Sequence, residues 1–110
     1  MGTHRVRRLE EEIRSEVSRL LLFEAGDPRI RDVTVTRVTL TRDLGLARVY
    51  YESSNPDQRT MLQEGLEAAT PFIRRNIASR LDLRLAPQIE FYYDETSEEV
   101  RKVEKLFSKL

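Results

Sequence analysis

The chain has 110 residues, of which 39% are hydrophobic and 35% charged, and its formal net charge is zero. This length fits a single domain over residues 1–110, and the composition argues against general disorder. The absence of cysteine excludes disulfide frameworks, thiol chemistry and cysteine-ligated zinc, and the longest apolar run, residues 20–23, is far shorter than the roughly 20 residues that cross a bilayer.

The first predicted element is an amphipathic helix over residues 4–24. Its apolar residues recur at spacings of three and four, the pattern of one helix face: Val6, Leu9, Ile13, Val17 and Leu20. A stop signal follows at Gly26. Because the segment is acidic at residues 10–12, it does not resemble a signal or transit peptide, and we expect a cytoplasmic protein.

Residues 33–41 and 46–53 predict the two strands of a hairpin, joined by a turn over residues 42–45. The first segment is almost entirely β-branched, which is typical of a strand. Its apolar positions change phase, from 33 and 35 to 38 and 40. This change indicates either a β-bulge or a strand that is covered on both faces.

The next helical segment contains Pro71. Proline inside a helix removes one hydrogen bond and clashes with the preceding turn, at a cost of about 3 kcal/mol. We therefore expect two helices, over residues 57–69 and 71–82, that meet at a kink, with the proline as first residue of the second. Alternating apolar residues predict a third strand over residues 88–93, and Thr96 and Glu99 form a capping box for a last helix over residues 97–110.

No pattern typical of a catalytic, metal or cofactor site is present in the sequence. The single histidine, His4, lies in a terminal segment where no scaffold would hold it. The four glycines are isolated and have neither Walker nor Rossmann spacing. The acidic pairs fall in turns or on predicted solvated faces, where carboxylates need no catalytic role. We expect a binding protein that has no enzymatic activity, cofactor or small-molecule substrate.

The charges are distributed unevenly, which favours a nucleic-acid surface on the second half of the helix pair. Residues 49–69 carry a net −3, whereas residues 70–86 hold four arginines against one aspartate. Arginine suits bidentate phosphate contact, and a helix start exposed at the kink would offer free N–H groups to an anion. An ordinary solvated helix face is the alternative. The tyrosines Tyr50, Tyr51, Tyr92 and Tyr93 alternate along strands, so half belong in the core, and base stacking by one of them is the less favoured interpretation.

Several short motifs follow one another in order over residues 4–94. They are Arg5-Val6-x-x-x-Leu9, Glu24-x-x-Asp27-Pro28-Arg29-Ile30, Val33-Thr34-Val35-Thr36-x-Val38, Thr41-Arg42-Asp43-Leu44-x-x-Ala47-x-Val49-Tyr50, Phe72-Ile73-Arg74 and Leu83-Arg84-x-x-Pro87-x-Ile89-x-Phe91-x-x-Asp94. In this order they are similar to the motifs of ribosome-binding factor A, a bacterial family. Each motif is weak alone, but their joint order is specific.

The resemblance implies an α+β fold, namely a KH-like domain of the second type. The implied order is αββααβ with an additional C-terminal helix, and a kinked helix pair replaces the GXXG loop that grips nucleic acid in other KH domains. It also implies a cytoplasmic, monomeric, non-enzymatic factor that binds the free 30S subunit and immature 16S rRNA. Such factors assist late maturation, including the 5′ end and neck region, and take part in cold adaptation.

The expected RNA-binding residues fall into two groups. The main group is the helix kink with the basic segment after it: Ala69, Thr70, Pro71, Arg74, Arg75, Arg80 and Arg84. The family places glycine where this chain has Pro71. The second group consists of Arg5, Arg7, Arg8, Arg29 and Arg31. These five have an equally good interpretation as surface charges that neighbouring acids balance.

Two other functions fit the sequence less well. A general KH-like module would bind short single-stranded RNA, but it would normally carry the GXXG loop. A protein–protein module would use the last helix as a ligand for a groove on a partner, and its association would be insensitive to salt.

Overall fold

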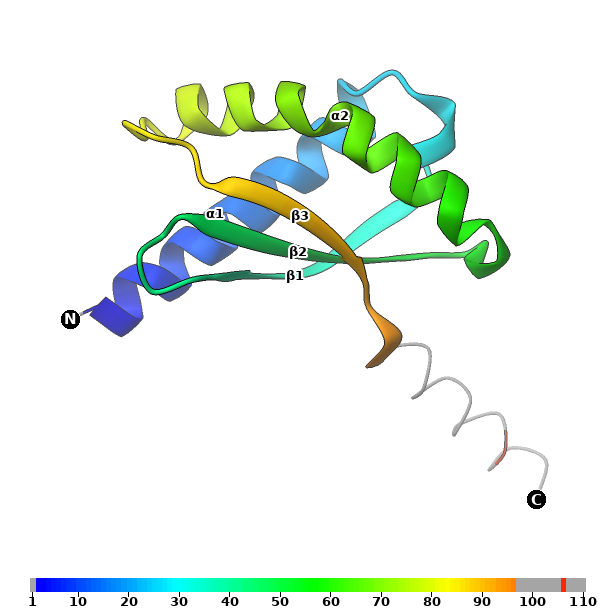
Figure 1. The fold of residues 1–110 in the computed structure, drawn as a ribbon, viewed down its shortest axis with the longest axis horizontal. Coiled ribbons are helices and arrows are strands. Elements are labelled where there is room, and N and C mark those ends of the chain that lie inside the picture. The colour runs from blue at the N-terminus through cyan, green and yellow to red at the C-terminus, as the bar shows by residue number, and fades with distance from the viewer. Residues whose placement is uncertain (1, 97–105, 107–110) are drawn as a thin grey trace.

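Two long helices and a three-stranded sheet form the fold, which is the α+β, KH-like class expected from the sequence (Figure 1). The structure is a computed structural model that describes residues 2–96 and 106. The helices are α1 (Gly2–Phe23) and α2 (Arg59–Arg80), and the strands are β1 (Val33–Leu40), β2 (Leu46–Ser53) and β3 (Gln88–Tyr93). Two 3-10 turns, η1 (Pro28–Ile30) and η2 (Pro56–Gln58), precede β1 and α2. The predicted last helix, residues 97–110, lies outside the described residues apart from residue 106.

β1 pairs antiparallel with β2, which pairs parallel with β3, so β2 is the central strand. The register of β1 shifts between Val35 and Arg37, where Thr36 is the extra residue. This confirms the bulge and excludes the alternative of a strand covered on both faces. The bulge restores the alternation, since Val35 and Val38 are both buried on either side of it.

α1 and α2 cover one face of the sheet and form a single core with it. The apolar face of α1 is fully buried at Ile13, Val17 and Leu20, which confirms the helical periodicity. From α2, Leu66 and Ile73 enter the same cluster as Val49 of the central strand. The side chains at alternate positions of the strands therefore point away from the core, on a sheet face that we call the open face.

Gly65 allows α2 to pass close to η1. A Cβ atom built on this residue would lie 2.7 Å from the Cγ2 atom of Ile30, which is closer than real Cβ contacts. Ile30 is fully buried, so it has little room to move aside. The glycine is therefore required by close packing, and it does not form part of a phosphate-binding loop.

The sequence prediction of two helices around Pro71 is wrong. α2 continues through Pro71 as one helix of 22 residues, so the observed order over residues 2–96 is αββαβ. The helix changes direction along its length (Figure 1). Proline supplies no amide hydrogen to the carbonyl of residue 67, and the Thr70 hydroxyl donates to the Leu66 carbonyl at 2.9 Å, an interaction that bends helices. Packing of buried residues on both sides of the proline, Leu66 and Ile73, outweighs the local cost of an interior proline.

Candidate nucleic-acid interface

The continuous course of α2 removes one of the reasons for placing an anion at Pro71. A helix uses the amides in its interior for its own hydrogen bonds, so the residues after Pro71 do not form an exposed helix start. Pro71 itself is exposed, and Ala69 and Thr70 are partly buried. These three residues therefore influence the direction of α2 and offer no set of free backbone N–H groups to an anion.

Arg74 has a structural partner within the chain. Its Nε atom donates to the Pro87 carbonyl at 3.0 Å, and its Nη2 atom donates to the Ala86 carbonyl at 3.2 Å. The side chain is partly buried. Its planar fork thus ties the second half of α2 to the loop that leads into β3. Sequence reasoning missed this role because the two carbonyls come from a different element.

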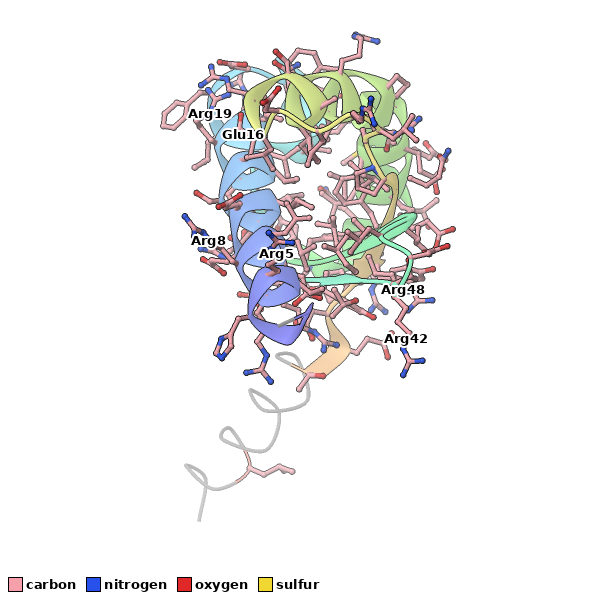
Figure 2. The ribbon with its side chains drawn as sticks, turned by 90° about the vertical axis from the view of Figure 1, so that its left-hand side faces the viewer. Arg5, Arg8, Glu16, Arg19, Arg42 and Arg48 are labelled. Carbon is pink, nitrogen blue, oxygen red and sulfur yellow. The ribbon has the colours of Figure 1, made fainter. Side chains whose placement is uncertain are left out.

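Arg80 belongs to an ionic cluster that joins α2 to α1. It lies 3.8 Å from the Glu16 carboxylate and 4.0 Å from that of Glu24. Arg19 contacts the same two acids at 2.6 and 2.7 Å, and Figure 2 shows Glu16 beside Arg19 on α1. Arg19 holds the pKa of Glu24 below its usual range. The long contacts and the half-exposed side chain leave Arg80 only weakly neutralised.

Arg75 and Arg84 are exposed, as Arg80 is, but they lie outside the ionic cluster. Arg75 lies on α2, and Arg84 lies in the loop between α2 and β3. Neither forms a salt bridge with another residue in the described part of the chain. Of the four arginines predicted on this segment, these two combine an exposed side chain with the lack of a salt bridge among the described residues.

The second group of arginines divides in the same way. Arg29 forks onto Asp27, with Nη2 to Oδ2 at 2.8 Å, and this contact holds the pKa of Asp27 below its usual range. Arg5, Arg7 and Arg31 are exposed. Arg8 is also exposed, and its contact with Glu12 at 3.3 Å is a surface pair of small energetic value.

Three further arginines lie next to the N-terminal group, and sequence reasoning did not single them out. Arg42 is in the hairpin turn, Arg48 is on β2, and Arg37 follows the bulge of β1; all three are exposed. Figure 2 shows Arg42 and Arg48 at the same end of the molecule as Arg5 and Arg8 of α1. The Glu10 carboxylate supports this arrangement, because it accepts from the Leu40 amide at 2.7 Å and so ties α1 to the hairpin.

The sequence contains a signal that could have found Arg48. It alternates with buried Ala47 and Val49, so an outward direction follows from the strand period. Arg37 offers no such signal, because its direction depends on where the bulge lies. We call Arg5, Arg8, Arg42 and Arg48 the turn-end arginines.

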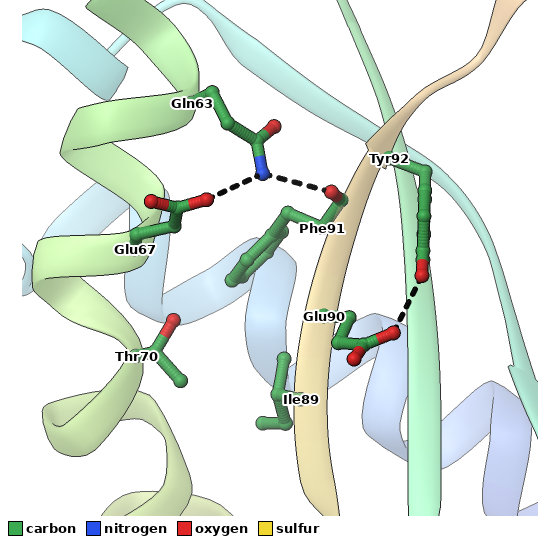
Figure 3. A pocket seen from close by; sticks show the side chains of 7 residues that line it. All are labelled: Gln63, Glu67, Thr70, Ile89, Glu90, Phe91 and Tyr92. Carbon is green, nitrogen blue, oxygen red and sulfur yellow. Dashed lines mark hydrogen bonds between the residues drawn. The ribbon is translucent and has the colours of Figure 1, made fainter.

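A groove between α2 and β3 is the place where an extended ligand could contact the sheet edge (Figure 3). Gln63 bridges it, since its Nε2 atom donates to the Phe91 carbonyl at 2.9 Å and to Glu67 at 3.1 Å. Glu67 and Glu90 line the groove. Two carboxylates and an occupied edge carbonyl make this groove unfavourable for a phosphate backbone.

Neither metal coordination nor membrane insertion finds support in the described residues. Residues 2–96 and 106 contain no cluster of histidine, aspartate and glutamate able to hold a metal ion. Within the same residues, neither helix has the length and apolar character of a membrane span.

Comparison with known proteins gives a consistent result. The family model described as ribosome-binding factor A matches residues 5–107. The ribosome-binding factor A of Lacticaseibacillus casei is 36% identical over 109 residues, covering 97% of this chain and 93% of that protein.

Solved structures show the same fold. The crystal structure of ribosome-binding factor A from Thermus thermophilus has a TM-score of 0.71 at 24% identity, covering 80% of this chain and 94% of that one. A homology model of the Thermus thermophilus factor, fitted into the cryo-EM map of a 30S complex, has a TM-score of 0.68 at 24% identity, covering 83% and 97%. The chain belongs to the ribosome-binding factor A family.

Proposed function

We propose that this chain is a non-enzymatic assembly factor that binds the free small ribosomal subunit through immature 16S rRNA. The observation that carries the proposal is family membership, with a match over residues 5–107. The factor of Thermus thermophilus has been fitted into a map of its complex with the 30S subunit. The same subunit is the partner that we assign to this chain.

Arginine accessibility supports RNA as the bound component. Arg75 and Arg84 are exposed on one segment, and the turn-end arginines are exposed on another. Although the formal net charge of the chain is zero, phosphate binding depends on the local field of such a surface. We assign phosphate contact to Arg75 and Arg84 first, with Arg80 as a weaker member.

The finer parts of the function follow from the family. The chain would act late in the maturation of the subunit, including the 5′ end and neck region of 16S rRNA, and it would support growth in the cold. It would do so in the cytoplasm, as a monomer of one domain, without a cofactor. Catalysis has no support from the described site, where arginines and tyrosines are not arranged around an activated nucleophile or base.

The groove beside β3 counts against a general single-stranded RNA module. That function would need a basic edge groove, whereas Glu67 and Glu90 line this one and Gln63 closes it. The alternative of a protein–protein module rests on the last helix, which lies outside the described residues.

Co-sedimentation on sucrose gradients tests the proposal. The protein is mixed separately with free small subunits, large subunits and 70S ribosomes, and its recovery is compared across the three. We expect recovery with free small subunits and none with translating 70S ribosomes. Equal recovery with all three particles would argue for non-specific RNA binding, and recovery with none would overturn the proposal.

A further inference from the structure

A row of flat side chains crosses the open face of the sheet. The guanidinium carbon of Arg37 lies 3.9 Å from the ring centroid of Tyr50. The rings of Tyr50 and Tyr92 are 5.7 Å apart, with 31° between their planes. One side chain comes from each strand, so the row runs perpendicular to β1, β2 and β3.

The pairing of the strands builds this row. The bulge at Thr36 brings Arg37 opposite Tyr50, and the parallel register brings Tyr92 beside Tyr50 on its other side. The bulge is held in place by its own hydrogen bonds, because the Thr36 hydroxyl donates to the Asp94 carboxylate at 2.5 Å. The sheet therefore fixes the backbone positions from which the row extends.

The core does not need this row. Tyr92 is 41% exposed and Tyr50 is half-buried, whereas Tyr51, which points to the other face, is 1% exposed. Tyr51 and Phe91 fill the core face of the same two strands. Burial thus explains the inward aromatic residues and leaves the outward pair without a packing role.

The arginines beside the row suit an anionic ligand with flat rings. Arg48 and Glu52 lie two residues from Tyr50 along β2 on the same face, and Arg42 lies in the adjoining turn. Glu90 is also close, and its carboxylate accepts from the Tyr92 hydroxyl. Aromatic rings stack on nucleic-acid bases regardless of sequence, while arginines contact the neighbouring phosphates.

We propose that the open face, through Tyr92 and Tyr50 flanked by Arg37 and Arg48, stacks an unpaired nucleotide of ribosomal RNA. This inference rests on the proposed function, and it names the part of the RNA that the sheet recognises. It assigns the open face a role separate from that of Arg75 and Arg84: the helix arginines contact phosphates, whereas the row holds a base.

A tryptophan reporter tests stacking directly. The chain has no tryptophan, so Tyr92→Trp introduces a single fluorophore into the row. We expect decaadenylate RNA to quench its emission, and the same strand in a duplex with decauridylate to quench it much less, because paired bases are not available for stacking. The matched control is Phe23→Trp, at an aromatic residue of α1 that is 77% exposed. Equal quenching at both positions would overturn the inference.

Binding to small subunits supplies the second measurement. Tyr92→Ala should weaken co-sedimentation about tenfold, in the range measured for loss of one stacked base, while Tyr92→Phe and Phe23→Ala should bind like the wild type. If the wild type binds and Tyr92→Ala binds equally well, the stacking inference fails and the proposed function stands. If Tyr92→Phe weakens binding as much as Tyr92→Ala, the hydroxyl is the contact, and stacking is again excluded.

A third outcome would contradict the proposed function without contradicting the stacking inference. If the wild type does not bind subunits, the proposed function fails. Quenching of Tyr92→Trp by decaadenylate would then still establish the row as a base-stacking surface, and lack of quenching would overturn both proposals. Photo-crosslinking of Tyr92 to a ribosomal protein and not to RNA would also overturn the stacking inference.

Discussion

Arg74 and Arg75 are neighbours in the sequence and have different surroundings in the structure. Arg74 turns its fork to two loop carbonyls, whereas Arg75 is exposed. Four arginines within residues 70–86 therefore do not make four equivalent phosphate contacts. One of them stabilises the fold, one is exposed and joins an ionic cluster, and two are exposed outside that cluster.

We predict that Arg74→Ala lowers the free energy of unfolding by about 1–3 kcal/mol, since the carbonyls of residues 86 and 87 lose a charged hydrogen-bond donor. Arg75→Ala should change it by less than about 0.5 kcal/mol, as is usual at an exposed position. Urea denaturation measures both values. At equal folded fraction, Arg75→Ala should weaken association with small subunits more than Arg74→Ala does. The reverse order would show that Arg74 leaves its carbonyl partners to contact RNA.

The strands were predictable because their signal is local. Apolar residues alternate along residues 88–93, and both predicted ranges, 46–53 and 88–93, match the observed strands. The change of phase in β1 even indicated the bulge. The partners of Arg74 were not predictable, because they depend on how the loop at residues 86 and 87 folds back beside α2.

At the scale of an element, α2 is the helix whose continuity could not be predicted from the sequence. A proline inside a helix has a high free-energy cost, so local helix propensity predicts that one helix ends there and a second begins. The fold keeps one helix because buried residues on both sides of Pro71 pack into the same core. Tertiary packing thus outweighs the helix-breaking effect of Pro71, and the predicted kink is observed as a bend in a continuous helix (Figure 1).

We predict that Pro71→Ala leaves the fold intact and does not lower the melting temperature. Alanine supplies an amide donor to the carbonyl of residue 67 and has the higher helix propensity. The gain should be partly offset, because proline also restricts the unfolded chain. The bend should decrease, which NMR residual dipolar couplings on the two halves of α2 can measure.

The same variant should bind small subunits more weakly if the bend sets the direction of Arg75 relative to the core. Thr70→Val is the matched control, because it removes the hydroxyl bond to the Leu66 carbonyl and keeps the proline. A straightened helix with unchanged subunit binding would show that Pro71 serves the fold alone.

At the scale of the whole molecule, several of the exposed arginines lie toward one end of the sheet. Arg84 lies in the loop before β3, and the first amide of that strand bonds the Gly45 carbonyl of the hairpin turn at 2.9 Å. The turn-end arginines lie at this same end (Figure 2). The first residue of β1 pairs instead with the last residue of β2, so Arg31, two residues before β1, marks the opposite end. Arg59, the first residue of α2, lies at that end too, because its guanidinium carbon is 4.0 Å from the ring centroid of Tyr93, the last residue of β3. A chain with no net charge can therefore present a basic end to RNA.

The salt dependence of binding tests whether RNA contacts this basic end of the molecule. Each neutralised phosphate releases counterion, with a log–log slope of roughly −0.7 to −0.9 per contact, so Arg75→Gln with Arg84→Gln should weaken subunit binding and flatten the slope by about one to two units. Replacement of the same two residues by lysine should recover part of the affinity, because charge is kept and the bidentate fork is lost.

The matched control, Arg31→Gln with Arg59→Gln, removes the same charge from the opposite end and should leave the slope nearly unchanged. Titration of each variant with labelled subunits between 50 and 200 mM salt, roughly the range over which such contacts are felt, provides the measurement. An equal change of slope for both pairs would mean that binding responds only to net charge. The RNA would then not bind preferentially at the end of the molecule that carries Arg84 and the hairpin turn.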